Sequence, residues 1–173
     1  NTYLHDTQER LRSIYEGSND AIMLLTENGF IDCNVRTLEM LGLQDKTEFI
    51  GHNPAEFSPP VQPDGRASMV AVTDDIAKAL QSGKNQFEWV HRRKNGEDFS
   101  AEVLLSAFDY AGERILQATV RDITEQKNTE LALQRESSTW IQAMDSFADA
   151  IYLIDEKRHL VRANKTFYGM LHL

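Results

Sequence analysis

The sequence has little of several things that would place it in a specialised class of protein. It has one cysteine, Cys33, so no internal disulfide can form and a reducing compartment is expected. No apolar run approaches the ~18 residues of a membrane-spanning helix, and no secretory signal peptide opens the chain. These absences predict a cytoplasmic protein with no membrane segment in this chain. The first residue is not methionine, so we expect an excised fragment.

Positive charge is also scarce, because 18 Lys and Arg stand against 27 Asp and Glu, for a net charge of −9. Binding to a phosphate backbone needs clustered basic side chains. The nearest basic run is Arg92-Arg93-Lys94, at the tip of an expected hairpin, where a solvated turn is the favoured interpretation. We therefore expect no nucleic-acid partner.

The sequence also lacks a recognisable catalytic or metal-binding motif. An enzyme would need a nucleophile, a base and an orienting group within hydrogen-bond reach. The candidates are Ser58, Ser106, His52 and His91, without a nucleophile elbow or a phosphate loop. The five histidines are dispersed, and the carboxylate pairs Asp74-Asp75 and Glu97-Asp98 are expected on solvated surfaces. We therefore expect no enzyme activity, no catalytic residues and no metal site in this chain.

The strongest pattern that is present runs from Gln86 to Asp122. An Asn95-Gly96 pair separates two runs of alternating apolar residues and predicts a tight hairpin in which both turn residues have positive φ. A second turn, at residues 111–113, leads to a third run over 115–120. Because alternation with a period of two buries one face of a strand, this stretch predicts a three-stranded antiparallel meander.

The meander leads directly into a helix. Asp122 can accept hydrogen bonds from the free N–H groups of a first helical turn, and Glu125 can reach back as in a capping box. We therefore predict that Asp122, Thr124 and Glu125 relay a signal from the sheet into the helix.

The residues before the meander predict a helix, two strands and further helices. Residues 2–17 form an amphipathic helix whose apolar seam, Leu4, Leu11 and Ile14, lies on the domain's own sheet or pairs with a second chain. Strands over 20–26 and 30–34 precede a helix over 35–41. Gly51 and all four prolines interrupt residues 45–63, so only single helical turns fit there. A helix over 68–82, capped by Ser68, has an apolar stripe of Met69, Val72, Ile76 and Leu80.

The beginning of the chain returns near its end. Residues 20–24, Asp-Ala-Ile-Met-Leu, recur as residues 149–153, Asp-Ala-Ile-Tyr-Leu, and Asn34 corresponds to Asn164. Residues 40–43 correspond to residues 170–173, and the seam of the first helix corresponds to Leu133, Trp140 and Ala143. The second unit holds only the first quarter of the repeat, so Ile151, Leu153 and Leu171 would lack most of their core.

Together these residues resemble a PAS domain with its C-terminal PAC motif, over about residues 15 to 130. The motifs are Asp20-Ala21-Ile22, Asn34 before a helix that ends at Leu41-Gly42, residues 87–96 (Phe-Glu-Trp-Val-His-Arg-Arg-Lys-Asn-Gly), and Arg121-Asp122-Ile123-Thr124. The resemblance implies an α+β fold with a five-stranded antiparallel sheet, in the order 2-1-5-4-3, and short helices on one face. It also implies a sensor or dimerisation role in bacterial signalling proteins such as histidine kinases of two-component systems or diguanylate cyclases.

This resemblance gives the expected division of the chain. The parts are a helix over 1–17, a PAS domain with its PAC motif over 18–124, a linker or signalling helix over 125–146, and the N-terminal fragment of a second PAS domain over 147–173. The function expected is a sensory or regulatory module that relays a ligand or partner signal through its C-terminal helix to an output domain elsewhere in a longer protein. The alternative is a ligand-free structural dimerisation module. A homodimer through Leu4, Leu11 and Ile14 is expected.

The resemblance leaves the cofactor open, because PAS domains hold haem, flavin, small acids or nothing. Flavin photoreceptors place a reactive cysteine after Gly-Arg-Asn, where this chain has Pro54 after Gly51-His52-Asn53, so covalent flavin chemistry is excluded. Cys33 is expected to be a small buried apolar residue. A non-covalent flavin could stack on Trp89 and bond His91; the favoured alternative is that Trp89 fills the core and His91 satisfies a buried polar group. Haem is disfavoured, because the helix over 68–82 has no histidine and His52 precedes it.

A ligand would lie between the inner face of the sheet and the helices. The wall residues expected from strand alternation are Met23, Leu25, Trp89, His91, Ala101, Val103, Leu116, Ala118 and Val120.

Overall fold

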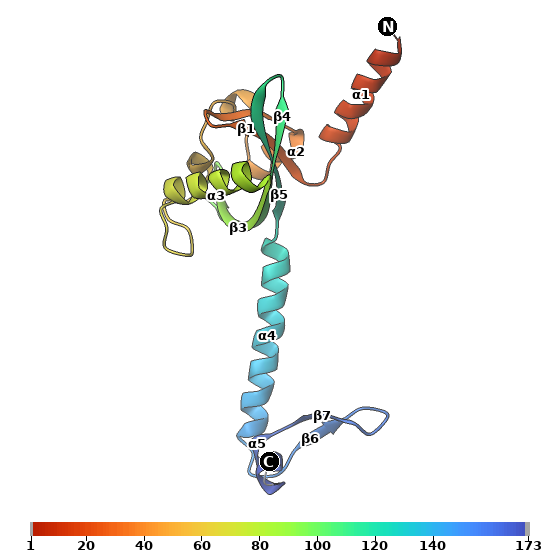
Figure 1. Cartoon of the computed structure of the whole chain (residues 1–173). Coiled ribbons are helices and arrows are strands. Elements are labelled where there is room, and N and C mark those ends of the chain that lie inside the picture. The colour runs from red at the N-terminus through yellow and green to blue at the C-terminus, as the bar shows by residue number, and fades with distance from the viewer. Residues whose placement is uncertain (1, 172–173) are drawn as a thin grey trace. The chain divides into compact units, whose positions relative to one another are not determined.

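The structure is a computed structural model that describes residues 2–171. The chain divides into two compact units between Thr124 and Glu125, and each is described by itself here (Figure 1). The last two positions of the expected repeat, His172 and Leu173, lie outside the described residues.

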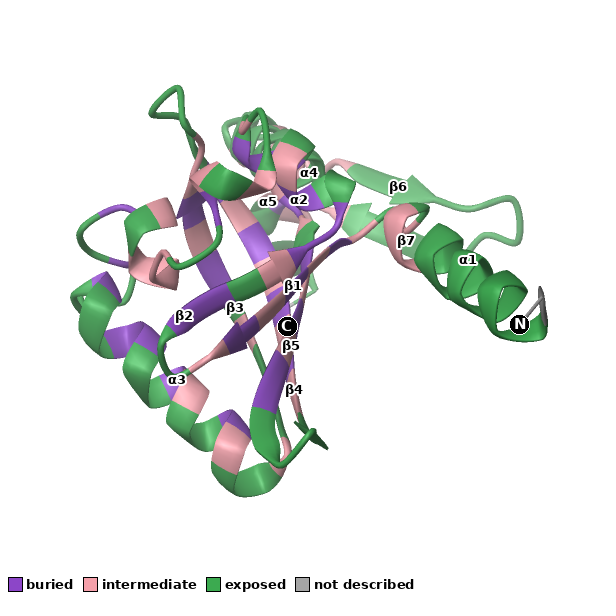
Figure 2. Ribbon diagram, turned by 90° about the horizontal axis from the view of Figure 1, so that it is seen from above, coloured by how far each residue is buried: buried purple, intermediate pink, exposed green. Residues whose placement is uncertain are grey.

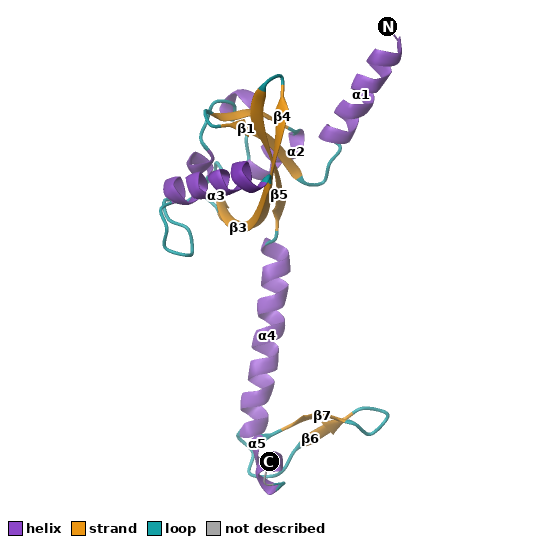
Figure 3. Ribbon diagram, in the orientation of Figure 1, coloured by secondary structure: helices purple, strands orange, loops and turns teal. Residues whose placement is uncertain are grey.

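The first unit is built on one antiparallel sheet of five strands (Figure 3). The strands are β1 (Ala21–Thr26), β2 (Gly29–Cys33), β3 (Lys84–Arg92), β4 (Asp98–Tyr110) and β5 (Glu113–Asp122). Their order is β2-β1-β5-β4-β3, which confirms the expected sheet. The meander register pairs Trp89 with Ala101, and Val103 with Val120.

Helices cover one face of this sheet. They are α2 (Val35–Leu41), the single turns η1 (Lys46–Glu48) and η2 (Pro54–Phe57), and α3 (Ser68–Ser82). Buried residues alternate along the strands, as Figure 2 shows in purple, because successive side chains point to opposite faces. The core joins Met23, Val103 and Leu116 of the sheet to Phe49 and Val72 of the helical side. Single turns within residues 45–63 were expected, and the structure has them.

The hairpin between β3 and β4 differs from the predicted two-residue turn. Only Gly96 has a positive φ, of 88°, so the prediction of two such residues is wrong for Asn95. The Arg93 N–H donates to the Glu97 carbonyl at 2.9 Å, and the loop between them is longer and ends with the left-handed residue. The Lys94 N–H donates to the Leu41 carbonyl at 2.8 Å, so a tertiary contact helps to set the shape of this loop.

Helix α3 begins without the predicted cap. Ala67 occupies the capping position without a side-chain bond, whereas the Ser68 hydroxyl donates to the Pro59 carbonyl and accepts from Gln62 Nε2 at 2.8 Å. The predicted stripe also shifts, because Met69 is 53% exposed while Ala71 and Ala79 are buried. The sequence pattern predicted the helix correctly. The face that is buried in the structure is rotated from the predicted apolar stripe toward Ala71 and Ala79.

Asp75 of α3 is buried, which contradicts its expected place on a solvated surface. Its exposed fraction is 4%, and its Oδ1 accepts a hydrogen bond from Asn85 Nδ2 at 3.1 Å. A hydrogen bond of this kind offsets much of the free energy that a carboxylate loses when it is removed from water.

Helix α4 (Thr124–Asp145) begins at the last residue of the first unit and continues into the second, which also contains β6 (Tyr152–Ile154), β7 (Leu160–Ala163) and α5 (Lys165–Met170). Strands β6 and β7 pair antiparallel with a register shift after Leu153, as β1 and β2 do after Leu24. The side chains of Leu153 and Leu171 are each 52% exposed. The second unit therefore repeats the local structure of the first without its core.

Candidate functional site

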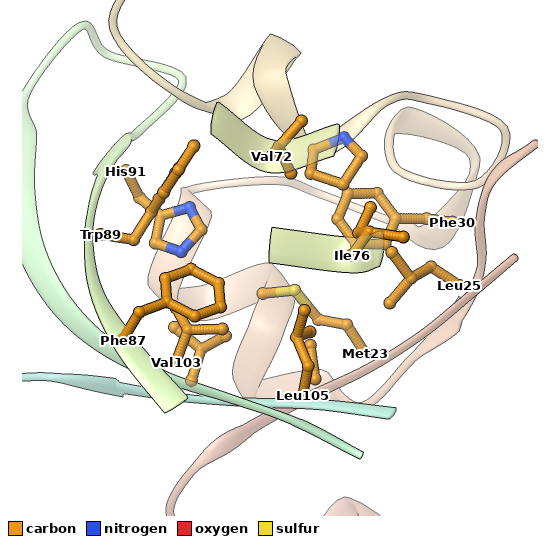
Figure 4. Close-up of a pocket in the computed structure, with 13 residues that line it drawn as sticks. Met23, Leu25, Phe30, Val72, Ile76, Phe87, Trp89, His91, Val103 and Leu105 are labelled. Carbon is orange, nitrogen blue, oxygen red and sulfur yellow. The ribbon is translucent and has the colours of Figure 1, made fainter. Parts of the chain in front are cut away.

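A cavity lies between the inner face of the sheet and helices η2 and α3. Thirteen side chains line a free volume of about 40 Å³. Figure 4 shows Phe87, Trp89 and His91 on one side of it and Leu25 and Ile76 on the other. Strands β1, β3, β4 and β5 all contribute, because the residues of each strand that face inward share one parity.

The structure brings together most of the wall residues expected from the sequence. Those that line the cavity are Met23, Leu25, Trp89, His91, Val103, Ala118 and Val120. Ala101 and Leu116 are buried but lie outside the lining. That these residues bind a ligand stays a prediction.

Six lining residues were missed from the sequence: Phe30, Pro54, Val72, Ile76, Phe87 and Leu105. Phe87 and Leu105 have the same strand parity as residues that were chosen, so alternation could have found them. Val72 and Ile76 belong to the expected apolar stripe of α3. Phe30 and Pro54 reach the cavity through the tertiary arrangement, for which the sequence has no local signal.

His91 is the side chain of this lining whose polar atoms have no partner. It is 7% exposed, and neither ring nitrogen makes a hydrogen bond of acceptable geometry. His91 thus has no well-aligned hydrogen bond, although the backbone of Phe57 comes close enough to its ring to act on its pKa. That His91 satisfies a buried polar group stays a prediction. Trp89 differs, because its indole N–H donates to Ser58 Oγ at 2.9 Å.

Burial lowers the pKa of His91 to about 4, because the charged imidazolium would lose its hydration. The nearby backbone of Phe57 and the carboxylate of Asp122 oppose this shift, and the guanidinium of Arg93 adds to it. His91 is therefore neutral at pH 7.

A second cluster of contacts lies where β5 ends. The guanidinium of Arg93 stacks on Phe99, 3.9 Å from the ring centroid, and its Nη2 lies 2.7 Å from Asp122 Oδ2. Its Nη1 donates to the Met40 carbonyl at the end of α2. Arg93 is only 22% exposed, so the expectation of a fully solvated basic turn is wrong at this position.

Asp122 connects this cluster to the first residue of α4. Its Oδ1 accepts a hydrogen bond from the Thr124 N–H at 2.9 Å, as predicted for a helix start. Burial opposes ionisation of Asp122, but the bonds from Thr124 and Arg93 outweigh it and hold the pKa below its usual value. Glu125 lies exposed in the first turn of α4. A relay role for Asp122, Thr124 and Glu125 stays a prediction.

The N-terminal helix α1 (Thr2–Glu16) contacts the domain through its last turn. The Tyr15 carbonyl accepts from Asn34 Nδ2 at 3.0 Å, and Glu16 Oε2 accepts from the Val35 N–H at 2.7 Å. The seam residues Leu4, Leu11 and Ile14 are 67%, 62% and 64% exposed. The seam therefore does not pack on the domain's own sheet, which leaves it free for pairing.

The cavity does not fit a flavin or a haem in this conformation. Its volume is well below the roughly 300 to 1,000 Å³ of typical cofactor pockets. His52, the alternative haem ligand, lies half-exposed beside Glu56, with Nδ1 2.9 Å from Oε2. Cys33 is fully buried, as expected, and burial raises the pKa of its thiol to about 11.

Within residues 2–171 no group of three or more potential metal ligands converges. No helix there combines the length and the apolarity that crossing a bilayer requires.

Known proteins share this fold and parts of this sequence. A sensor associated with a methyl sulfide methyltransferase from Methanosarcina acetivorans is 27% identical over 143 residues, which are 82% of this chain and 14% of that protein. The chain thus spans about a seventh of that curated relative. The PAS domain of an HTR-like protein from Haloarcula marismortui is 28% identical, with a TM-score of 0.57 over 70% of this chain and 96% of that one. A PAS domain from Colwellia psychrerythraea is 20% identical, with a TM-score of 0.58 over 69% and 99%.

Family models agree with the division seen in the structure. The model of the PAS domain matches residues 19–125, and another PAS model matches residues 138–173. Residues 19–125 hold the five-stranded sheet, the cavity and the contacts of Asp122. The chain therefore belongs to the PAS domain family, as a PAS sensor domain followed by the start of a second PAS domain.

Proposed function

We propose that this chain is the sensory module of a larger signal-transduction protein. A signal received by the first PAS domain passes through α4 to an output domain, such as a histidine kinase or a diguanylate cyclase, elsewhere in that protein. The parts of the module are a helix over 1–17, the PAS domain over 18–124, a signalling helix over 125–146 and the start of a second PAS domain over 147–173. The sensor in M. acetivorans supports a sensory role.

One set of contacts carries this proposal, because it runs from the cavity to the start of α4. The His91 ring stacks on the Phe99 ring at 5.6 Å between centroids. The guanidinium of Arg93 also packs on the Phe99 ring. Arg93 holds Asp122, which accepts from the N–H of Thr124. A displacement of His91 would therefore change the packing of Phe99 and the position of Arg93, and with it the first turn of α4.

The test is to replace Arg93 by methionine, which keeps apolar bulk and removes the charge. We expect amide exchange in residues 124–128 to become up to about fivefold faster, because Asp122 loses the guanidinium that positions it and a helix cap is worth about 1 kcal/mol. In a protein that includes the output domain, the response to stimulus should fall as well. Unchanged exchange together with unchanged output would refute the relay.

The matched control is Arg114→Met. Arg114 pairs with Asp109 at 3.2 Å next to the β4–β5 turn, where both side chains are exposed. This variant removes an Arg–Asp pair from the same sheet without touching α4. It should leave exchange in residues 124–128 as it is in the wild type.

A second candidate function is dimerisation without a ligand, favoured by the exposed seam of α1. Leu11→Glu would place a charge in the seam, and sedimentation should then show a lower mass if α1 pairs. Ser13→Glu changes charge on the neighbouring face and serves as the control. A mass unaffected by Leu11→Glu would rule out this interface.

A further inference from the structure

The cavity presents one hydrogen-bonding side chain to an otherwise apolar space. His91 is more than nine-tenths buried, and neither ring nitrogen makes a well-aligned hydrogen bond. The backbone of Phe57 comes near the ring, so at least one of the two nitrogens is left for a ligand. Its neighbours in the lining include Met23, Val72 and Val103, which offer no strong donor or acceptor. A buried polar group left without a bond costs about 1 to 3 kcal/mol, so a molecule that supplies the bond is favoured.

The volume of the cavity limits the size of that molecule. About 40 Å³ is available. One water-sized group occupies roughly 12 Å³ on this measure, so the space holds on the order of three to four non-hydrogen atoms. Half-buried Pro54, Ile76 and Phe87 form the outer part of the lining, where such a molecule can enter.

Water itself fits this site poorly. A buried water usually makes about three hydrogen bonds, and apolar cavities of this kind stay dry. A neutral imidazole offers one donor and one acceptor. The other polar side-chain group of the lining, the indole N–H of Trp89, already donates to Ser58 Oγ. An apolar body with one polar group matches the cavity better.

Charge on the molecule is disfavoured by the same surroundings. The lining contains no Lys, Arg, Asp or Glu. The nearby guanidinium of Arg93 stacks on the Phe99 ring and already pairs with Asp122. A carboxylate or an ammonium group would therefore lose its hydration without gaining a charged partner.

We propose that the cavity binds a small uncharged molecule of about three to four non-hydrogen atoms, with an apolar body and one hydroxyl or carbonyl group that is hydrogen-bonded to His91. This inference rests on the proposed sensory function, because it names the class of ligand whose binding the contacts from His91 to Asp122 would pass on.

The experiment is a titration of the whole chain, followed by two-dimensional NMR of the backbone and of the His91 ring nitrogens. The probes are 1-propanol, acetone, acetate and xenon, which are similar in size but differ in charge and in hydrogen bonding. We expect saturable shifts with 1-propanol or acetone at dissociation constants on the order of 0.1 to 1 mM, since so few atoms limit affinity. Which of the two binds more tightly identifies the polar group.

His91→Phe tests the hydrogen bond, because phenylalanine keeps the aromatic ring beside Phe99 and has no polar atom. We expect affinity for the preferred probe to fall at least fivefold while xenon binding is retained. His91→Gln, which can still hydrogen-bond, should recover part of the affinity. The control is His159→Phe, an exposed histidine of the second unit, which should change nothing.

Several results would overturn the proposal. They are tighter binding of acetate than of 1-propanol and acetone, equal affinity of wild type and His91→Phe, or no saturable shift with any probe. If His91→Phe fails to fold, the shift of the His91 ring nitrogens in the wild type decides, because no change at saturation means no hydrogen bond. These failures leave the Arg93→Met result untouched, so the relay and the ligand class are tested separately.

Discussion

The two units of this chain contain the same local structure in two different surroundings. In the first, Asn34 accepts from the N–H groups of Ile22 and Thr37 and donates to the carbonyls of Tyr15 and Asp20. In the second, Asn164 accepts from Ile151 and Phe167 and donates to Met144 and Asp149. Both asparagines are at most 1% exposed and have the same φ and ψ. One buried amide therefore joins helix, strand and helix in each unit.

The strands beside these asparagines differ in burial. Met23 and Leu25 of β1 are each 2% exposed, whereas Tyr152 and Ile154 at the corresponding places of β6 are 55% and 48% exposed. β1 pairs with β5 and contacts α2, while the described second unit has two strands. The comparison shows that the local hydrogen bonds form without a core, but that burial needs the rest of the sheet.

The largest effect is expected at the two asparagines. Asn34→Ala removes the five hydrogen bonds of this buried side-chain amide and should lower the free energy of unfolding of the first unit by about 4 kcal/mol. Asn164→Ala should loosen β6 and β7 and leave the first unit unchanged. Urea unfolding followed by NMR at residues of each unit would measure both. A loss of stability in the first unit from Asn164→Ala would contradict the independence of the units.

The next effect concerns apolar side chains at matching positions. Leu25→Ala opens the core next to the cavity and should cost about 3 kcal/mol in urea unfolding. Ile154→Ala removes a side chain that is half exposed and should cost less than about 0.5 kcal/mol. Similar costs for the two variants would mean that the second unit has a core of its own.

A third prediction concerns pH, because among residues 2–171 the buried histidine, His91, lies in the first unit. His91 has a pKa near 4 when folded and 6.5 when unfolded. As the pH falls below 6.5, the unfolded chain takes up a proton that the folded chain does not, so stability falls as the pH falls. The loss should reach about 2 kcal/mol between pH 7 and pH 5.

The measurement is urea unfolding of the first unit at several pH values, in wild type and in His91→Phe. The difference between the two curves isolates His91 from the carboxylates that also titrate at low pH. Parallel curves over this range would show that His91 becomes protonated in the folded state without cost.

The smallest effect is expected at the first residue of the repeated motif. The Asp20 carboxylate pairs with Arg121 of β5 at 2.9 Å, and the guanidinium of Arg121 holds its pKa below the usual value. Since the Arg121 side chain is 63% exposed, Asp20→Ala should cost about 0.5 kcal/mol. Asp149→Ala, at the matching place in the second unit, should change nothing measurable in the same unfolding assay.

Strand alternation gave much of the fold and most of the cavity wall. It predicted the meander and the inward side chains of Trp89, His91 and Val103, because side-chain direction in a strand repeats every two residues. It failed for α3, where Ser68 binds Pro59 and Gln62 instead of capping its helix. A capping prediction depends on a side chain having no stronger partner, and that partner was set by the fold.

The contact between Arg93 and Asp122 had no local signal at all. The two residues are separated by 28 others and meet because β3, β4 and β5 align side by side. The same holds for Phe30 and Pro54, which reach the cavity from segments outside the meander.

The sequence by itself determined the strands, the helix starts at Asn34 and Asn164, and the repeat of one unit in the other. These features follow from backbone geometry and from hydrogen bonds between residues close in sequence. Only the tertiary structure decided that His91 faces an apolar cavity without a partner and that Arg93 joins Phe99 to Asp122. Such pairings depend on which strands become neighbours, and that is settled by burial of the whole sheet rather than by any short stretch of the chain.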